Sequence, residues 1–576
     1  MRYVLSVGFV LLREEGPIDL QSFNWKIEAA GSGSGEGMTQ SKIVKTRWML
    51  GWLAVAALIG GAMILSGCGG SGKTPPPPTG GFSVASLKGQ YGFSMSGLDL
   101  SGAYLARAGS FAADGNGKIT AALEDVVDLG ATPTASTVAF TGGTYDIQPN
   151  GRGVMILQNP NGGGLQMNFI LNSTSQGELL QTDLNAAAAG GFNLQTPANF
   201  TAAAISGNYV FDLSGVSFSS TNTVAPITTI GQVAADGNGN ITSGTIDVKD
   251  GNTDTASGAI TLMPGTYQMD LTNGNGANFG RGTMTFNGHT FAFYIVNSAR
   301  VLLLEEDTLG GSLGSALQQS GTIPTTNAGF TGSFVYMVGG SSVMGSEGAL
   351  ARAARFTADG QGGISAVSLD DNNNGSINHI APGTNLTDAT YAIDTAHAGS
   401  GRGTFTFKDS GLGTFTNVFY MISPTQAVVQ DISPGLITVG PMLAQSGSPF
   451  TNANLAGNYA LSWDGVQLGV TTSIPFQEDL VGQYVLSDAS SNNITGVVDY
   501  TELGLSNSTF LSDIGLTGNL KITGDGTNRN SLQVVTGGSS STTFDFEGYV
   551  ANSTTMFIVS TDNSRVVAGV VTQQTQ

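Results

Sequence analysis

The sequence is poor in the residues that most often carry chemistry or hold a small fold together. It has one cysteine and three histidines in 576 residues, and only 11% of its residues are charged. One cysteine cannot form an internal disulfide, so stability must come from packing and strand pairing. The 21 basic residues stand against 41 acidic ones, a formal net charge of −20. This balance excludes nucleic acid, which requires clustered cations.

Glycine and apolar residues are abundant instead. There are 84 glycines, and 40% of the residues are hydrophobic. Apolar side chains at this frequency can build cores, so the chain is not a disordered low-complexity protein. The length allows three or four domains.

The single cysteine, Cys68, stands at the end of a secretory leader. A basic segment (residues 42–47) precedes an apolar run from Trp48 to Leu65, and Ser66-Gly67-Cys68 follows. A basic region, an apolar region and a small-residue cleavage site together predict a signal peptide. A cysteine directly after that site resembles the lipobox of bacterial lipoproteins.

The lipoprotein resemblance implies that residues 38–67 are removed and that Cys68 carries the acyl chains, palmitate among them. The protein would then be held on a membrane by lipid, in the cell envelope. Gly69 stands where an inner-membrane retention signal would place aspartate, which favours the outer membrane or the cell surface. The alternative is a transmembrane anchor, because about 20 apolar residues can span a bilayer.

Residues 1–37 do not fit a leader, because they carry acidic residues and a Gly/Ser-rich stretch before the basic segment. We expect Met38 to be the true start and residues 1–37 to be an upstream extension. Residues Gly67 to Thr74 match the phosphate-loop pattern G-x-x-x-x-G-K-[ST]. Such a loop must open a helix, and Pro75 to Pro78 cannot do so. We interpret residues 68–84 as a lipidated Gly/Pro tether.

The rest of the chain contains four internal copies of one pattern. A G-x-aromatic opening recurs at intervals of 118, 125 and 125 residues. Repeats of this length are whole domains rather than solenoid units. We predict β-domains at 85–195, 205–320, 329–447 and 453–576. The recurring positions are the opening Tyr91, Tyr209, Phe334 and Tyr459, and the arginine of a Gly-Arg-Gly motif, Arg152, Arg281 and Arg402.

The second copy predicts strands joined by short turns. Residues 208–213 alternate apolar and polar side chains, which is typical of a half-buried strand. Asp236-Gly237-Asn238-Gly239 is a hairpin turn sequence, and Asn287-Gly288 is another. Seven or eight such strands predict an all-β chain of antiparallel meanders, each a small up-and-down barrel or a sandwich. The fourth copy diverges, and we interpret it as having lost the Ala-Asp-Gly turn and the Gly-Arg-Gly motif.

The opening strand and the domain length resemble lipocalin-type barrels, although tyrosine or phenylalanine stands where those barrels carry tryptophan. The ligand cavity of that family is therefore not implied here. The whole pattern also resembles glycine-rich repeat lipoproteins of soil bacteria.

Candidate sites are few. Asp370, Asn372 and Asn374 match the start of an EF-hand loop, but Ala381 replaces the acid expected at its twelfth position, so calcium is a weak expectation and no other cofactor is predicted. The recurring arginines predict a structural role, pairing with the aspartate of the Ala-Asp-Gly turn or packing on the opening aromatic residue. We predict no catalytic residue.

These patterns favour a non-enzymatic, membrane-anchored surface lipoprotein that serves binding, adhesion or envelope structure. Its partners would be glycans, small molecules or envelope proteins. Two alternatives remain: a hydrolytic enzyme with its site in one copy, the first candidate being the third copy with His379 and His397, and an outer-membrane β-barrel.

Overall fold

The computed structural model describes residues 81–576, except for residues 131–133, 220–222, 257, 272–275, 344–347, 385, 470–475, 488–491, 504–507, 524–526 and 538–540. The predicted signal peptide, Cys68 and nearly all of the tether lie outside the described residues. Gly70–Gln576 forms one compact unit. None of the helices in the described part of the chain has the length and hydropathy that a membrane span requires.

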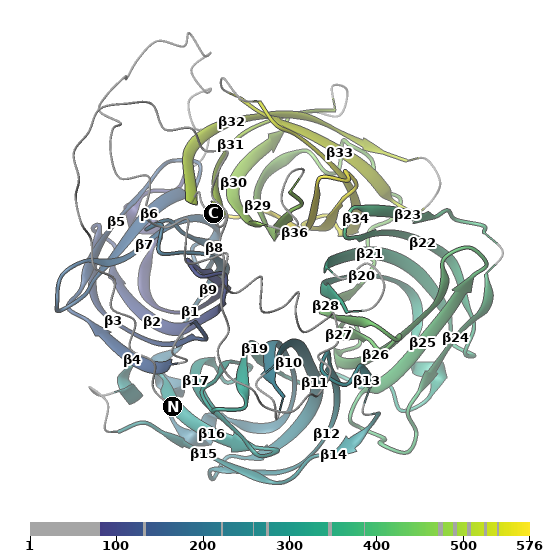
Figure 1. Cartoon of the computed structure of the whole chain (residues 1–576), viewed down its shortest axis with the longest axis horizontal. Helices are drawn as coiled ribbons and strands as arrows, with labels where there is room; N and C mark the ends of the chain where they lie inside the picture. The colour runs from purple at the N-terminus through teal and green to yellow at the C-terminus, as the bar shows by residue number, and fades with distance from the viewer. Residues whose placement is uncertain are drawn as a thin grey trace, which may run out of the picture. The chain divides into compact units, whose positions relative to one another are not determined.

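This unit contains four antiparallel sheets in chain order, which we call barrels 1 to 4 (Figure 1). Barrel 1 contains β1 (Lys88–Asp99), β2 (Tyr104–Asp114), β3 (Lys118–Asp128), β4 (Thr134–Phe140), β5 (Gly143–Ile147), β6 (Arg152–Gln158), β7 (Gly164–Ser173), β8 (Gln176–Gln181) and β9 (Ala186–Leu194). Barrel 2 contains β10 (Ser206–Phe218), β11 (Val224–Asp236), β12 (Asn240–Asp250), β13 (Thr255–Ala256), β14 (Ile260–Thr261), β15 (Gly265–Met269), β16 (Arg281–Phe286), β17 (His289–Asn297), β18 (Arg300–Glu305) and β19 (Gly310–Gln318).

Barrel 3 contains β20 (Thr331–Ser342), β21 (Gly348–Asp359), β22 (Ile364–Asn373), β23 (Ser376–Ile380), β24 (Thr387–Ile393), β25 (Arg402–Asp409), β26 (Gly413–Ser423), β27 (Gln426–Asp431) and β28 (Leu436–Ala444). Barrel 4 contains β29 (Gly457–Gln467), β30 (Phe476–Leu486), β31 (Asn493–Leu503), β32 (Ser508–Ile522), β33 (Arg529–Thr536), β34 (Thr543–Asn552), β35 (Thr555–Ser560) and β36 (Arg565–Gln573). Short 3-10 helices are η1 (Val84–Ser86), η2 (Pro197–Asn199), η3 (Ala202–Ala204), η4 (Gly276–Phe279) and η5 (Asn327–Gly329).

The barrels close in different ways. Barrel 4 is a continuous eight-stranded barrel in sequence order. In barrel 1 the start of β3 pairs with β5 over only two residue pairs, and β4 lies beside β3. In barrel 2 the start of β12 pairs with β15 over only two residue pairs, and the short strands β13 and β14 lie beside β12. In barrel 3 a single bridge from Gly363 to Thr390 spans the corresponding gap. The predicted all-β fold of antiparallel meander domains is confirmed, and the domains are barrels rather than sandwiches.

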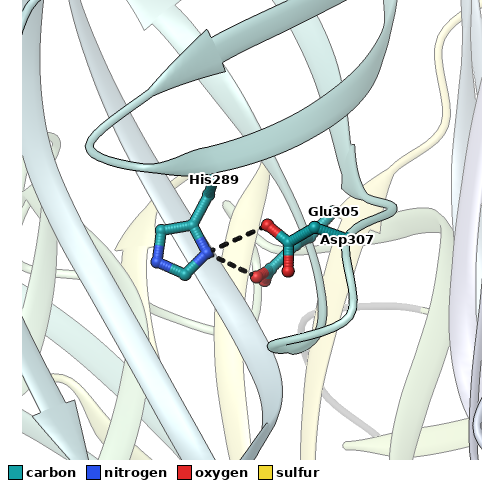
Figure 2. A group of neighbouring side chains, drawn as sticks. All are labelled: His289, Glu305 and Asp307. Atoms are coloured by element: carbon teal, nitrogen blue, oxygen red, sulfur yellow. Dashed lines mark hydrogen bonds and ion pairs between the residues drawn. The ribbon is translucent and has the colours of Figure 1, made fainter.

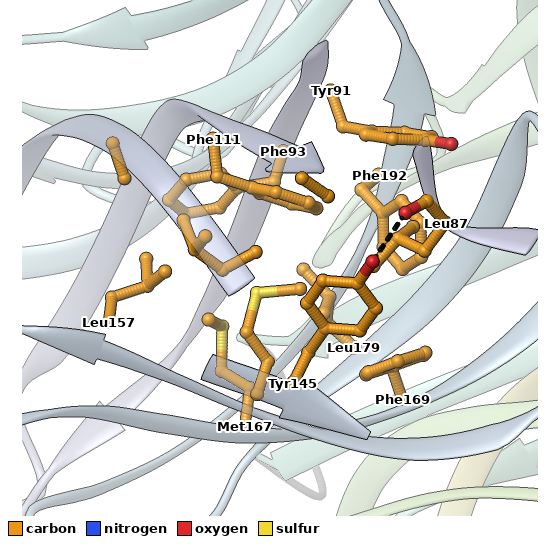
Figure 3. Close-up of a cluster of buried hydrophobic side chains, with 14 of the residues drawn as sticks. Leu87, Tyr91, Phe93, Phe111, Tyr145, Leu157, Met167, Phe169, Leu179 and Phe192 are labelled. Carbon is orange, nitrogen blue, oxygen red and sulfur yellow. Dashed lines mark hydrogen bonds between the residues drawn. The ribbon is translucent and has the colours of Figure 1, made fainter. Parts of the chain in front are cut away.

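Each barrel has a packed interior. In barrel 1 the alternating inward residues form an aromatic cluster around Phe111, which lies 5.4 Å from Tyr91 and 5.7 Å from Phe192 between ring centres (Figure 3). The hydroxyl of Tyr145 donates to the carbonyl of Leu87 at 2.8 Å, which ties β5 to the entry segment. Barrels 2, 3 and 4 contain equivalent clusters. Side chains therefore fill these interiors over most of their length.

The Ala-Asp-Gly motif forms the predicted hairpin turn. Asp236 accepts hydrogen bonds from the backbone N–H groups of Asn238 and Asn240, at 2.7 and 3.0 Å, and Gly237 and Gly239 have positive φ angles. Asp114 and Asp359 make the same pair of backbone contacts in barrels 1 and 3. The side-chain and backbone hydrogen bonds lower the pKa of Asp236.

The two glycines of the Gly-Arg-Gly motif serve different purposes. The first, Gly280 in barrel 2, has a φ angle of 73°, which side chains disfavour. The second, Gly282, lies under the ring of Phe293, and a Cβ there would come within 2.1 Å of that ring. In barrel 4 Asn528 takes the first position with a φ angle of 61°, because asparagine tolerates this conformation.

Candidate functional site

The recurring arginines lie at the junctions between barrels. Arg281 of barrel 2 reaches Asp125 on β3 of barrel 1 with two parallel hydrogen bonds, 2.7 Å from Nε and 2.9 Å from Nη2. Its Nη1 donates to Asp270 of its own barrel. The hydroxyl of Tyr294 donates to the same Asp125 carboxylate at 2.8 Å. Burial alone would lower the pKa of Arg281, but its contacts with Asp125 outweigh burial and raise it.

The same contact joins each barrel to the one before it. Arg402 of barrel 3 binds Asp247 of barrel 2 at 2.7 and 2.8 Å, and Arg529 of barrel 4 binds Asp370 of barrel 3 at 2.7 and 2.9 Å. A tyrosine hydroxyl again donates to each aspartate: Tyr420 to Asp247 at 2.7 Å and Tyr549 to Asp370 at 2.6 Å.

The cycle closes between barrel 4 and barrel 1. Arg152 of barrel 1 binds Asp499 of barrel 4 at 2.5 Å and Asp513 at 2.7 Å. Ile170 pairs with Arg152 where tyrosine pairs with the arginine at the other junctions. Accordingly, the buried Oδ2 of Asp499 has no hydrogen-bond partner among the described residues.

A glutamine at the end of each copy forms the second half of every junction. Gln195 donates to the carbonyls of Phe279 and Ile295, at 3.1 and 2.7 Å. Gln319, Gln445 and Gln574 make the matching pairs of contacts with barrels 3, 4 and 1, respectively. The next residue adds a backbone hydrogen bond to the same barrel, as Thr575 does to Asn172. This Gln-Ser/Thr dipeptide recurs in the sequence, and its recurrence was the signal that could have revealed the junctions.

These contacts correct three sequence interpretations. The arginines pair with an aspartate on the third strand of the neighbouring barrel, not with the aspartate of the Ala-Asp-Gly turn. The arginines that lie over an aromatic ring in the described part of the chain are Arg352, over Phe415, and Arg565, over Phe544, and neither belongs to the Gly-Arg-Gly motif. The fourth copy keeps the motif arginine as Arg529, flanked by asparagines.

The residues of the weak calcium prediction have other partners. Asp370 and Asn372 lie on strand β22 rather than in a loop, and both oxygens of Asp370 accept hydrogen bonds, from Arg529, His379 and Tyr549. The amide of Asn372 donates to Ser560 and to the carbonyl of Arg565 in barrel 4. Asn374 lies in the turn after β22, with a φ angle of 50°. These three residues thus belong to the junction between barrels 3 and 4 and to its adjoining turn.

A second group of polar residues lies inside the barrels, where each contains a cation beside carboxylates. In barrel 1 Arg107 binds Glu124 at 2.8 Å, and in barrel 3 Arg352 binds Asp371 at 3.0 Å and also contacts Asp431. In barrel 4 Arg565 binds Glu478 at 2.6 Å. The cation lies on β2 in barrel 1 and on β21 in barrel 3, but on β36 in barrel 4. Because the strand differs, no recurring sequence motif predicts these groups.

Barrel 2 has a histidine in this role (Figure 2). His289 Nδ1 lies 2.7 Å from Glu305 Oε1 and 3.3 Å from Asp307 Oδ2, and the three possible ligand atoms lie within 4.8 Å of one another. Hydrogen bonds to Asp307 and Glu305 raise the pKa of His289 to about 10. At neutral pH the ring is therefore a cation that pairs with two carboxylates, and a metal would have to displace its proton. The arrangement is that of an ion pair.

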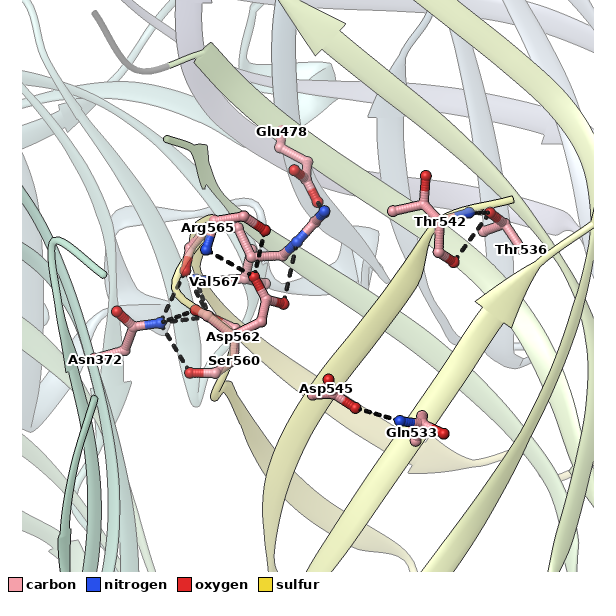
Figure 4. Close-up of polar contacts among 11 residues, drawn as sticks. Asn372, Glu478, Gln533, Thr536, Thr542, Asp545, Ser560, Asp562, Arg565 and Val567 are labelled. Carbon is pink, nitrogen blue, oxygen red and sulfur yellow. Dashed lines mark hydrogen bonds and ion pairs between the residues drawn. The ribbon is translucent and has the colours of Figure 1, made fainter. Parts of the chain in front are cut away.

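Barrel 4 differs because its polar end borders a cavity of about 400 Å³. Arg565 lies at this end, with its Nε 3.2 Å from Asp562 (Figure 4). Its guanidinium lies 4.2 Å from the centre of the Phe544 ring. Burial raises the pKa of Glu478 to about 7 although Arg565 opposes this rise. Tyr500, which packs against the barrel core, and Glu502 also line the cavity.

Comparisons with known proteins do not place the chain in a family. No family model and no curated protein matches the sequence. Among solved structures, transferrin binding protein B of Neisseria meningitidis serogroup B is similar at 11% identity and a TM-score of 0.20, covering 70% of this chain and 82% of that one. A mutant of the protein from Haemophilus parasuis Hp5 gives 11% and 0.19, covering 74% and 87%. Because these TM-scores indicate no common global arrangement, they assign neither partner nor function here.

Proposed function

We propose that this chain is a lipid-anchored, non-enzymatic binding protein of the cell envelope, whose four barrels act as one unit. The observation that supports this most strongly is the closed cycle of junctions. Each barrel is joined to the next by an arginine–aspartate pair and a glutamine, and the fourth is joined to the first in the same way. Such a cycle holds repeated surfaces at constant spacing.

Constant spacing favours binding rather than catalysis. Linked modules that engage a partner together gain avidity without new contacts, provided that their geometry allows it. The recurring motif arginines make contacts between barrels, as Arg281 does with Asp125, and the recurring aspartates of the Ala-Asp-Gly motif form hairpin turns. We therefore assign the recurring positions to assembly, and we expect recognition to rest on residues that differ between copies.

The anchor is tested by acylation of Cys68. Cells expressing the full chain would be grown with an alkyne-labelled palmitate analogue, and the protein isolated from the membrane fraction. We expect label on the wild type and none on Cys68→Ser. Label retained by Cys68→Ser, or an unlabelled wild type, would contradict a lipid anchor at this position.

Binding is tested with a chain that lacks residues 1–68, purified without detergent and applied to a glycan array and to envelope extracts. A retained glycan or envelope component supports the proposal. Release of a chemically altered product from the array would instead indicate an enzyme.

A further inference from the structure

The polar end of barrel 4 borders a cavity of about 400 Å³. We propose that its cavity binds a neutral sugar of one or two rings. This proposal rests on the binding function proposed above and names a class of ligand for it. The argument uses the wall of the barrel, the chemistry of the lining and the balance of charge.

The wall of barrel 4 is more continuous than that of the other barrels. Strand β32 pairs with β31 from Asn493 to Leu503, with one bulge near Val498. In barrel 1 the third strand, β3, pairs instead with two separate strands, β4 over seven residue pairs and β5 over two. In barrel 3 the third strand, β22, pairs with β23, and a single bridge leads to β24. The described residues that line the cavity all belong to barrel 4. The cavity thus lies at the polar end of a barrel whose third strand pairs with a single long strand, β32.

The lining combines apolar faces with groups that both donate and accept hydrogen bonds. Tyr500, Phe544 and Leu511 supply apolar surface, and Thr536 and Thr542 supply hydroxyl groups. Pockets of about 300–1,000 Å³ with apolar walls and a few convergent polar groups are typical of small-molecule sites. A sugar matches this lining, because it carries many hydroxyls and an apolar ring face.

The charges at the site favour an uncharged ligand. Arg565 is already paired with Glu478 and Asp562, and the cavity also contains Glu502, whose carboxylate accepts from the hydroxyl of Tyr500 at 3.1 Å. An anionic ligand would meet Glu502, and a cationic ligand would meet Arg565.

The test is calorimetric titration of the purified chain lacking residues 1–68 with glucose, N-acetylglucosamine and maltose, beside the charged sugars glucuronate and glucosamine. We expect at least one neutral sugar to bind, and to bind tighter than both charged ones. Binding of a charged sugar alone, or of none of the five, would overturn the proposal. Acylation of Cys68 is measured separately, so this failure is distinct from failure of the anchor.

The site is assigned with two variants. Leu511 is 47% exposed and lines the cavity, so Leu511→Trp should fill it and weaken binding at least about tenfold, which is 1.4 kcal/mol. Leu309→Trp is the matched control, because Leu309 is 53% exposed and lies in barrel 2. Glu502→Gln removes an acceptor with little change of shape and should also weaken binding. Sugar binding that none of these variants changes would place the ligand elsewhere and refute the assignment.

Discussion

The three junctions between consecutive barrels differ from the junction that closes the cycle. At the consecutive junctions a linker connects the two barrels, and a tyrosine shares the aspartate with the arginine. At the closing junction no linker exists, Ile170 replaces the tyrosine, and Asp513 gives Arg152 a second carboxylate that is 60% exposed. All four junctions therefore share two features, the arginine–aspartate pair and the glutamine.

The largest effect is expected from removing a junction arginine. Arg281→Ala would leave Asp125 and Asp270 buried without their cation, at a cost of about 3–5 kcal/mol. Arg152→Ala should cost less, because exposed Asp513 can return to water. Thermal unfolding of the two variants gives the comparison. A larger loss for Arg152→Ala would mean that the closing junction is the more important one.

A second test removes the tyrosine hydroxyl. Tyr420→Phe removes one of the two donors to Asp247 Oδ2, which keeps its hydrogen bond from Arg402 Nε, and losing this bond to a charged acceptor should cost about 1–3 kcal/mol. Tyr391→Phe is a control away from any junction, since its hydroxyl binds backbone carbonyls of its own barrel. Urea unfolding followed separately at the two positions would show whether the junction opens first. Equal behaviour of the two variants would contradict a special role for the shared aspartate.

The reverse change introduces a tyrosine at the closing junction. The hydroxyl of Ile170→Tyr should supply a donor to the unpartnered Asp499 Oδ2, while Ile170→Phe adds the ring alone. We expect the tyrosine variant to be more stable than the phenylalanine variant by about 1 kcal/mol. Their melting temperatures measure this difference, and a more stable phenylalanine variant would refute it.

A smaller, local effect is expected from the glutamines. Gln574→Ala and Gln319→Ala each remove two hydrogen bonds to carbonyls of the adjoining barrel, with a net contribution of about 1–2 kcal/mol. Only the closing junction lacks a linker to limit its opening. Amide hydrogen exchange around residues 150–172 should therefore accelerate in Gln574→Ala, while exchange around residues 400–421 changes less in Gln319→Ala. The opposite order would show that linkers do not stabilise the junctions.

The smallest effect concerns pH at the junction between barrels 3 and 4. The hydrogen bond to Asp370 raises the pKa of His379 above its ordinary 6.5. A raised folded pKa contributes stability that is complete below pH 6.5 and is lost as the pH rises through the folded pKa. His379→Gln should therefore lower the melting temperature slightly at pH 5.5, by an amount that shrinks as the pH rises. A deficit that grows with pH would contradict this linkage.

The sequence predicted the local features of this fold well. Alternating side chains indicated strands, and Asp236-Gly237-Asn238-Gly239 indicated a turn, because both patterns act between near neighbours in the chain. The strand Gly310–Gln318 was not predicted, since its glycines and small residues show no clear alternation. It is specified by its pairing with β10 about a hundred residues earlier, where Gly314 packs so closely on Asp212 that a Cβ would come within 1.8 Å of its carbonyl oxygen.

The sequence alone determined that the chain is all-β, that its pattern occurs four times and that Arg152, Arg281 and Arg402 hold equivalent places. Only the tertiary structure decided what those arginines bind. A salt bridge between copies depends on how two barrels pack, and no spacing within one copy encodes that packing. The charged groups inside the barrels also depend on tertiary structure. Arg352 and Arg565 lie on different strands of their barrels, β21 and β36, and only the closure of each barrel places them at the same end of its interior.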